Sequence, residues 1–127
     1  MKKLLIVEDD PMLVEIYQKK FSQDNSFEVL ISSSGLDAER KILNEKPDFV
    51  LLDLVLPERD GFEILEKIRK EKDLDKTKII IFSNLSQPEE RNRAEELGAD
   101  GFIVKSENTP QQIIDKVKEF AKKFEEQ

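Results

Sequence analysis

The sequence predicts an α/β fold, a doubly wound five-stranded parallel sheet with helices on both faces. Five short apolar runs alternate strictly with five segments whose apolar residues recur at helical spacing, and the links between them are short. Such alternation favours parallel strands joined by right-handed helical crossovers. The 127 residues suit one domain, and no linker or repeat divides them. We therefore expect a single domain over residues 1–127 with no separate output domain.

The composition excludes several kinds of chemistry. Without Cys or His, the chain offers no disulfide, thiol nucleophile, imidazole base or imidazole metal ligand. The net charge of −7 argues against direct binding of nucleic acid, and it suits a site that collects a hard cation on oxygen ligands. No apolar run is long enough to cross a membrane, and the N-terminus reaches Glu8 too soon for a signal peptide. We expect a cytoplasmic protein with no membrane partner.

The first two strand–helix units have clear boundary signals. A buried strand over Leu4–Val7 is followed by Asp10 and Pro11, an N-cap with proline in the first helical turn. A second strand over Phe27–Ile31 precedes a helix that Pro47 ends. Both strands are short, as expected for a sheet of this size.

The third unit places one carboxylate in an apolar segment. Val50–Leu52 reads as a strand buried on both faces, and Asp53 follows it. Pro57 cannot join a sheet ladder, and Asp60–Gly61 opens a helix that we expect to reach about Glu71. An isolated carboxylate is costly to bury without a partner, so Asp53 must lie at the carboxyl end of its strand, where open α/β sheets bind ligands. Taken alone, such an aspartate more often caps a turn.

The fourth and fifth units differ in how apolar their helices are. After a strand over Lys78–Phe82, Ser86–Glu89 has the spacing of a capping box, and the helix ends at Gly98 with few apolar residues. We expect that helix to be exposed and weakly packed. After a strand over Gly101–Lys105, Thr109–Gln112 gives a second capping box. The last helix carries a long apolar stripe: Ile113, Ile114, Val117, Phe120, Ala121 and Phe124.

Polar side chains end four of the five strands, at one predicted edge of the sheet. They are Glu8, Asp9 and Asp10 after the first strand, Asp53 after the third, Ser83 and Asn84 after the fourth, and Lys105 at the end of the fifth. Carboxylates supply the oxygen ligands that Mg²⁺ uses together with phosphate. An ammonium and a hydroxyl suit phosphoryl oxygens. Together these residues predict a site for a hard cation and a phosphoryl group.

Four motifs in order give the chain a resemblance to a known family. They are Ile6-Val7-Glu8-Asp9-Asp10, then Asp53 with Pro57 and Asp60-Gly61, then Ser83 after an apolar strand, then the run from Gly98 to Lys105. Over essentially its whole length the chain resembles a response-regulator receiver domain of two-component signalling, of the stand-alone, chemotaxis-regulator type. The resemblance implies a flavodoxin-like (βα)₅ domain that takes a phosphoryl group onto an aspartate from a phosphohistidine of a sensor kinase.

The resemblance implies a catalytic and a switch role for four residues. Asp53 would accept the phosphoryl group, Lys105 would contact it, and Ser83 would supply the switch hydroxyl. Phe102 would be the aromatic side chain that changes rotamer with Ser83. A carboxylate nucleophile is ionised at neutral pH and needs no general base, so the lack of His is no obstacle. The protein would catalyse its own phosphorylation and dephosphorylation and turn over no external substrate.

The resemblance also implies a metal site for Mg²⁺, with Mn²⁺ as the alternative. Its ligands would be Asp53, Asp9 directly, Glu8 largely through water, and the backbone carbonyl of Val55. Asp10 falls one position beyond the acidic pair, and we assign it to helix capping.

The implied partners are proteins. A sensor histidine kinase or a phosphotransfer protein would donate the phosphoryl group, and a downstream target would bind the face formed by the fourth helix, fifth strand and fifth helix. We expect a monomer or a weak homodimer. The charged residues of that face fit either dimer contacts or a solvated surface: Arg91, Arg93, Glu95, Glu96, Asp100 and Lys116.

Several positions depart from the family pattern. Ser106 stands where proline is usual, commonly after a cis peptide bond, and a non-proline cis bond costs about 2.5–4 kcal/mol. Asn84 replaces a smaller residue and would narrow the access to the acceptor. Phe102 lacks the hydroxyl of the usual tyrosine. The apolar Val55 and Leu85 occupy positions that tune phosphate lifetime in the family, and we expect them to hinder the attacking water.

Three rival functions remain open on the sequence. The first is a receiver-fold interaction module that signals by binding without phosphorylation, as the departures at Asn84 and Ser106 would allow. A Mg²⁺-dependent phosphatase is the second, although the chain is short for a substrate-covering cap. The third is a flavodoxin-like FMN carrier, whose phosphate loop should be rich in Ser, Thr and Gly where this chain has Glu8-Asp9-Asp10.

Overall fold

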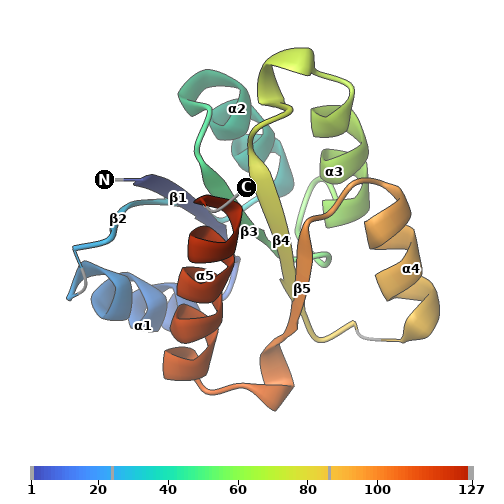
Figure 1. Cartoon of the computed structure of the whole chain (residues 1–127). Helices are drawn as coiled ribbons and strands as arrows, with labels where there is room; N and C mark the ends of the chain where they lie inside the picture. The colour runs from blue at the N-terminus through green and yellow to red at the C-terminus, as the bar shows by residue number, and fades with distance from the viewer. Residues whose placement is uncertain (1, 24, 86, 126–127) are drawn as a thin grey trace.

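Five parallel strands form the centre of the molecule, in the spatial order β2-β1-β3-β4-β5 (Figure 1). The structure is a computed structural model that describes residues 2–23, 25–85 and 87–125. The strands are β1 (Lys2–Val7), β2 (Phe27–Ser32), β3 (Phe49–Leu52), β4 (Lys78–Ser83) and β5 (Gly101–Val104). Because β1 lies between β2 and β3, the chain reverses its direction of winding beside β1, and ligand sites of open α/β sheets lie at such a point. The predicted fold class is confirmed.

In the described part of the chain, five helices cover the sheet, two on one face and three on the other (Figure 1). They are α1 (Pro11–Ser22), α2 (Gly35–Glu45), α3 (Gly61–Arg69), α4 (Pro88–Glu96) and α5 (Pro110–Glu125), with short 3₁₀ turns η1 (Lys72–Leu74) and η2 (Lys105–Glu107). Alternate strand residues face opposite cores, as the pleat requires. Leu5 and Val7 pack with α2, α3 and α4, whereas Leu4 and Ile6 pack with α1 and α5.

The helix starts follow the predicted capping residues, with one correction. Asp10 and Asp60 accept hydrogen bonds from the backbone N–H groups of Met12 and Glu63, both at 2.9 Å. Thr109 and Gln112 form the expected reciprocal capping box. The box predicted over Ser86–Glu89 was misplaced: the N-cap of α4 is Gln87, and Glu90 accepts the hydrogen bond from its N–H. Ser86 itself lies outside the described residues.

Two boundaries also differ from prediction. Helix α3 ends at Arg69 and not near Glu71, because the chain turns there toward η1. Lys105 opens η2 and does not belong to β5, which places its side chain just beyond the edge of the sheet. Every other predicted strand agrees with the structure to within one or two residues.

Helices α4 and α5 differ as their sequences predicted. Ala94 is the buried residue of α4, whereas α5 buries Ile113, Ile114, Val117 and Ala121. The weakly packed α4 therefore has little apolar area to hold it against the sheet.

Among the described residues, no helix is both long and apolar enough to cross a membrane.

Candidate phosphoacceptor and metal site

Asp53 lies one residue beyond β3, at the carboxyl edge of the sheet. Its backbone N–H still pairs with the Val7 carbonyl oxygen of β1 at 3.4 Å, so the end of β3 is aligned with the end of β1. The Asp53 residue is only 6% exposed. One carboxylate oxygen, Oδ1, accepts the backbone N–H of Val55 at 3.1 Å. The acceptor candidate is therefore a buried carboxylate with a fixed orientation.

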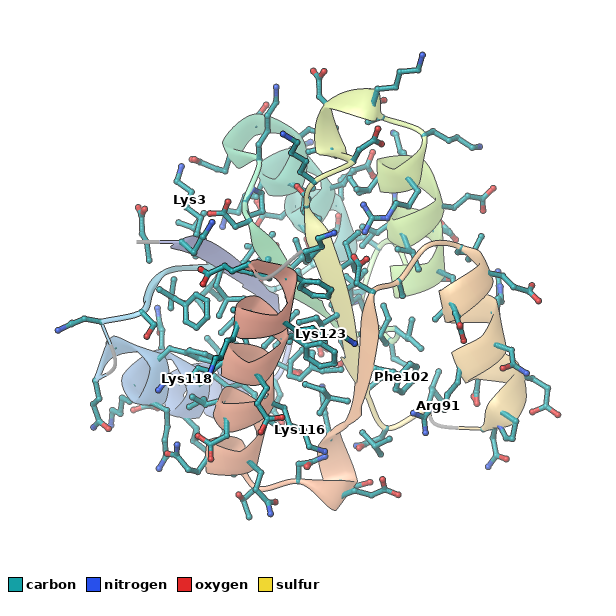
Figure 2. All side chains as sticks on the ribbon, viewed as in Figure 1. Lys3, Arg91, Phe102, Lys116, Lys118 and Lys123 are labelled. Carbon is teal, nitrogen blue, oxygen red and sulfur yellow. The ribbon has the colours of Figure 1, made fainter. Side chains whose placement is uncertain are left out.

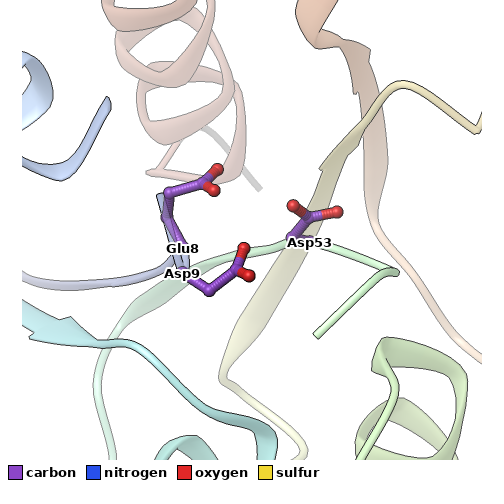
Figure 3. A group of neighbouring side chains, drawn as sticks. All are labelled: Glu8, Asp9 and Asp53. Atoms are coloured by element: carbon purple, nitrogen blue, oxygen red, sulfur yellow. The ribbon is translucent and has the colours of Figure 1, made fainter. Parts of the chain in front are cut away.

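Glu8 and Asp9 approach Asp53 from the end of the neighbouring strand. One carboxylate oxygen from each of the three residues lies within 4.8 Å of the other two, and the groups converge in Figure 3. Glu8 is buried and Asp9 is exposed. The Glu8 carboxylate is held by the backbone N–H of Asp10, which donates to Oε1 at 3.1 Å. The adjacency of β1 and β3 thus brings together the acidic residues that the sequence placed far apart.

Lys105 supplies the positive charge of this cluster. Its Nζ donates to Asp53 Oδ2 at 2.6 Å and also to Glu8 Oε2. The side chain reaches over the ring of Phe82, with Nζ 4.7 Å from the ring centroid, and only 10% of it is exposed. The ammonium therefore bridges the two buried carboxylates, which gives Asp53 the partner that its burial requires.

Burial and pairing move two pKa values at the site. Burial raises the pKa of Glu8 above its usual value, and the hydrogen bond and charge of Lys105 oppose that shift only in part. Burial also disfavours the charged form of Lys105. The hydrogen bonds and charges of Asp53 and Glu8 outweigh this effect, so the pKa of Lys105 is raised. Lys105 stays an ammonium at neutral pH.

The charges of the site do not balance. Three carboxylates face one ammonium, which leaves a net charge of −2 when all four groups are ionised. The ligand atoms that the three carboxylates offer to a metal are all oxygens, the ligand type that Mg²⁺ and Mn²⁺ accept. A divalent cation matches the cluster in both charge and ligand chemistry.

Ser83 and Phe102 lie on the neighbouring strands and outside this cluster. Ser83 is buried at the end of β4, and its Oγ accepts the backbone N–H of Leu85 at 3.2 Å. Phe102 is half-buried on β5, and the Arg91 guanidinium of α4 lies 5.0 Å from its ring centroid (Figure 2). No hydrogen bond or ion pair joins Ser83 to Asp53 or Lys105 within the part of the chain that the structure describes.

Cavities adjoin Phe102 on both sides. One, of about 250 Å³, is lined by Phe102 and residues of α4. The other, of about 280 Å³, is lined by Phe102 and by Lys116, Phe120 and Lys123 of α5 (Figure 2). Phe102 thus lines two hollows on the face formed by α4, β5 and α5.

Two of the residues that depart from the family pattern, Asn84 and Ser106, contact each other. Asn84 Oδ1 accepts the backbone N–H of Ser106 at 2.8 Å, a donor that proline would lack. The described residues contain no cis peptide bond, so the bond before Ser106 is trans. The sequence indicates both departures but not the contact between them. Their joint departure was the signal that could have linked them.

The chain belongs to the response regulator receiver domain family, because that family's model matches residues 4–118. The family consists of receiver domains of two-component systems, so the fold and the resemblance predicted from the sequence are confirmed. Among curated relatives, the alkaline phosphatase synthesis transcriptional regulatory protein PhoP of Bacillus subtilis (strain 168) is 29% identical over 124 residues. The match covers 98% of this chain and 50% of that protein.

A second relative is the probable transcriptional regulator ycf27 of Guillardia theta. It is 35% identical over 104 residues, which cover 82% of this chain and 39% of the relative. The chain therefore spans half or less of the length of these curated relatives, both of which are named as transcriptional regulators.

Solved receiver structures superpose closely on the chain. A CheY-like receiver domain protein from Methanospirillum hungatei JF-1 has a TM-score of 0.88 at 28% identity, over 99% of this chain and 98% of that one. The Mn²⁺-bound form of response regulator Rcp1 has a TM-score of 0.79 at 26% identity, over 88% of this chain and 86% of that one.

Proposed function

We propose that Asp53 accepts a phosphoryl group from a phosphohistidine of a sensor kinase or phosphotransfer protein, in a reaction that requires Mg²⁺. The observation that carries the proposal is the buried Asp53 carboxylate within a cluster of three carboxylates and one ammonium. When all four groups are ionised, the cluster keeps a net negative charge next to the nucleophile, and the Mn²⁺-bound relative supports a divalent cation there.

The chemistry needs no proton transfer to or from Asp53. A carboxylate oxygen of Asp53 forms a bond to phosphorus while the bond between phosphorus and the imidazole nitrogen breaks. The electron pair of that bond stays on the imidazole, which returns to its ordinary titration. The residues that would hold Mg²⁺ are Asp9, Asp53, the Val55 carbonyl and, through water, Glu8. The charge of the ion would offset the repulsion between phosphate and carboxylates. The protein contributes mainly position and charge.

Lys105 and Glu8 act as a pair. Glu8 holds the ammonium of Lys105 beside Asp53, and that ammonium is in place to bind the oxygens of the transferred phosphoryl group. Because Lys105 is largely buried, its charge is weakly screened and acts strongly on the phosphoryl oxygens. Lys105 would thus stabilise both the transition state of the transfer and the aspartyl phosphate that it forms.

The proposed switch connects the phosphoryl group to the face formed by α4, β5 and α5. The phosphoryl oxygens would draw the Ser83 hydroxyl away from the Leu85 N–H and so move the loop that leads into α4. Space vacated by Ser83 would let Phe102 turn inward and leave Arg91. Since α4 buries only Ala94, this helix moves at little cost and presents a changed face to a downstream protein.

Exposed apolar side chains support a protein as the phosphodonor. Met12, Val55 and Leu85 are the exposed large apolar residues within the described ranges, and they are 70%, 58% and 39% exposed. They follow β1, β3 and β4 respectively, at the same sheet edge as Asp53. Exposed apolar groups beside a polar site suit contact with another protein surface.

The test is the intact mass of the protein after incubation with Mg²⁺ and a small phosphodonor, acetyl phosphate or phosphoramidate. We expect the gain of one phosphoryl group, and we expect its loss with a chelator or in Asp53→Asn. Wild-type protein that gains no mass under any of these conditions would favour the interaction module. An adduct that persists in Asp53→Asn would assign a different acceptor.

A further inference from the structure

We propose that Glu39 is a positioning residue for Asp53, acting through Arg59 and the loop of residues 53–60 that joins β3 to α3. This inference rests on the proposed function of Asp53 as the acceptor. Glu39 lies on α2, outside the acidic cluster, and none of the roles described above uses it. It is nevertheless only 5% exposed, which is unusual for a carboxylate.

Two cations from different elements form ion pairs with the Glu39 carboxylate, whose buried Oε2 accepts no hydrogen bond from the described residues. Arg59 Nε lies 3.2 Å from Oε2, and Lys67 Nζ forms an ion pair with Oε1. Arg59 belongs to the 53–60 loop, whereas Lys67 belongs to α3. The Glu39 side chain is 6% exposed, compared with 33% for Arg59 and 49% for Lys67, so the carboxylate is the buried centre of the triad. It ties the loop to α2.

The backbone of the loop also packs directly on the first turn of α2. The Gly35 N–H donates to the Pro57 carbonyl oxygen at 3.1 Å. A Cβ atom on Gly35 would lie 1.9 Å from the carbonyl oxygen of Arg59, so the contact admits only glycine without movement. Arg59 is therefore held through its backbone by Gly35 and through its side chain by Glu39.

The loop requires such an anchor because its backbone is strained. Glu58 has φ = 71°, in the left-handed region that non-glycine residues rarely adopt. Residues held there cost free energy and persist where the surroundings determine their conformation. Glu58 directly precedes Arg59, so the ion pair with Glu39 acts at the strained point.

The opposite end of the same loop orients Asp53. The Val55 N–H donates to Asp53 Oδ1 at 3.1 Å, and the Gly61 N–H closes the loop onto the Leu54 carbonyl oxygen at 3.0 Å. Lys105 holds the other carboxylate oxygen, Oδ2. If the loop relaxes, Asp53 loses the Val55 hydrogen bond but keeps Lys105, and its carboxylate is free to rotate. Glu39 thus controls the direction in which Asp53 presents its oxygens.

Arg59→Met and Lys67→Met form a matched pair of variants. Each leaves Glu39 with one remaining cation, yet only Arg59 lies in the loop. For each we would measure amide hydrogen exchange of residues 54–60, Mg²⁺ affinity by calorimetry, and the rate of Asp53 phosphorylation by phosphoramidate. We expect Arg59→Met to speed exchange at Val55 and to weaken Mg²⁺ binding by about tenfold, a typical effect of losing a group that orients a metal ligand. Lys67→Met should stay within about twofold of wild type in all three, and Arg59→Lys should recover most of the loss.

The outcomes separate this inference from the proposed function. Equal effects of Arg59→Met and Lys67→Met on exchange and on Mg²⁺ affinity would overturn the positioning role and leave Glu39 as a stabilising ion pair. If the wild-type protein binds no Mg²⁺ and accepts no phosphoryl group, the proposed function itself is contradicted. Faster exchange in Arg59→Met alone would then show only that the anchor holds the loop, and the inference about Asp53 would fall with the function.

Discussion

The molecule buries carboxylates in two places and neutralises them differently. At the sheet edge, one ammonium pairs with Glu8 and Asp53, and together with Asp9 the cluster has a net charge of −2 when all its groups are ionised. On α2, a single carboxylate lies between two cations. Both are ion pairs with buried members, yet the first has an excess of carboxylates and the second an excess of cations. The excess of negative charge, which a divalent cation can offset, therefore distinguishes the candidate metal site from the Glu39 triad.

The largest expected difference between the two places follows from removing a cation. Lys105→Met leaves Glu8 and Asp53 buried without a positive charge, and we expect it to lower the free energy of unfolding at pH 7 by about 3 kcal/mol without Mg²⁺. Lys67→Met should cost only about 1 kcal/mol, because Arg59 still faces Glu39. Urea denaturation measures both. Equal losses would mean that the charge imbalance at the sheet edge has no energetic consequence.

Mg²⁺ should stabilise the protein through the sheet edge alone. A ligand that binds only the folded state at 100 times its Kd contributes about 2.7 kcal/mol. We expect this rise in the free energy of unfolding in wild type and in Lys67→Met, and its absence in Asp53→Asn. The same urea titrations with and without Mg²⁺ provide the measurement. Stabilisation of Asp53→Asn to the wild-type extent would place the cation elsewhere.

Neutralising one carboxylate should change the free energy of unfolding in opposite directions at the two places. Asp9→Asn relieves repulsion within the acidic cluster, so we expect it to raise the free energy of unfolding without Mg²⁺ by about 0.5–1 kcal/mol. Glu39→Gln leaves Arg59 and Lys67 without their shared carboxylate and should lower the free energy of unfolding by about 1 kcal/mol. Thermal unfolding in a chelator compares the two. Changes of the same sign would mean that the excess negative charge at the sheet edge does not destabilise the fold.

The smallest expected effect is the contribution of Asp37 to stability at low pH. Asp37, on α2 near Glu39, has a lowered pKa because the Ser32 hydroxyl donates to it at 2.7 Å and Lys41 lies beside it. A lowered pKa contributes stability above the unfolded-state value of 3.8, and this stability is lost as the pH falls through the folded-state pKa. Denaturation midpoints of wild type should therefore fall more steeply below that pH than those of Asp37→Asn. Parallel profiles would contradict this.

The sequence predicted most of the fold because its signals are local. Strand ends, N-caps such as Asp10 and the thin apolar stripe of α4 depend on residues a few positions apart. Asp53 and Glu8 could be placed together because parallel strands end at one edge. Asn84 with Ser106, and Glu39 with Arg59, escaped prediction. Each pair joins residues about 20 apart in sequence, and their contact depends on loop conformations that no local pattern specifies.

Because α4 buries only Ala94, its other positions can be substituted at little cost to folding. The residues that carry the proposed chemistry lie at the ends of β1, β3 and β5, whereas nearly every position of α4 faces away from the core. Substitutions there alter which surface is offered to a partner and leave folding and the acidic cluster largely untouched. Partner recognition can therefore diverge between domains of this kind while the proposed reaction stays the same.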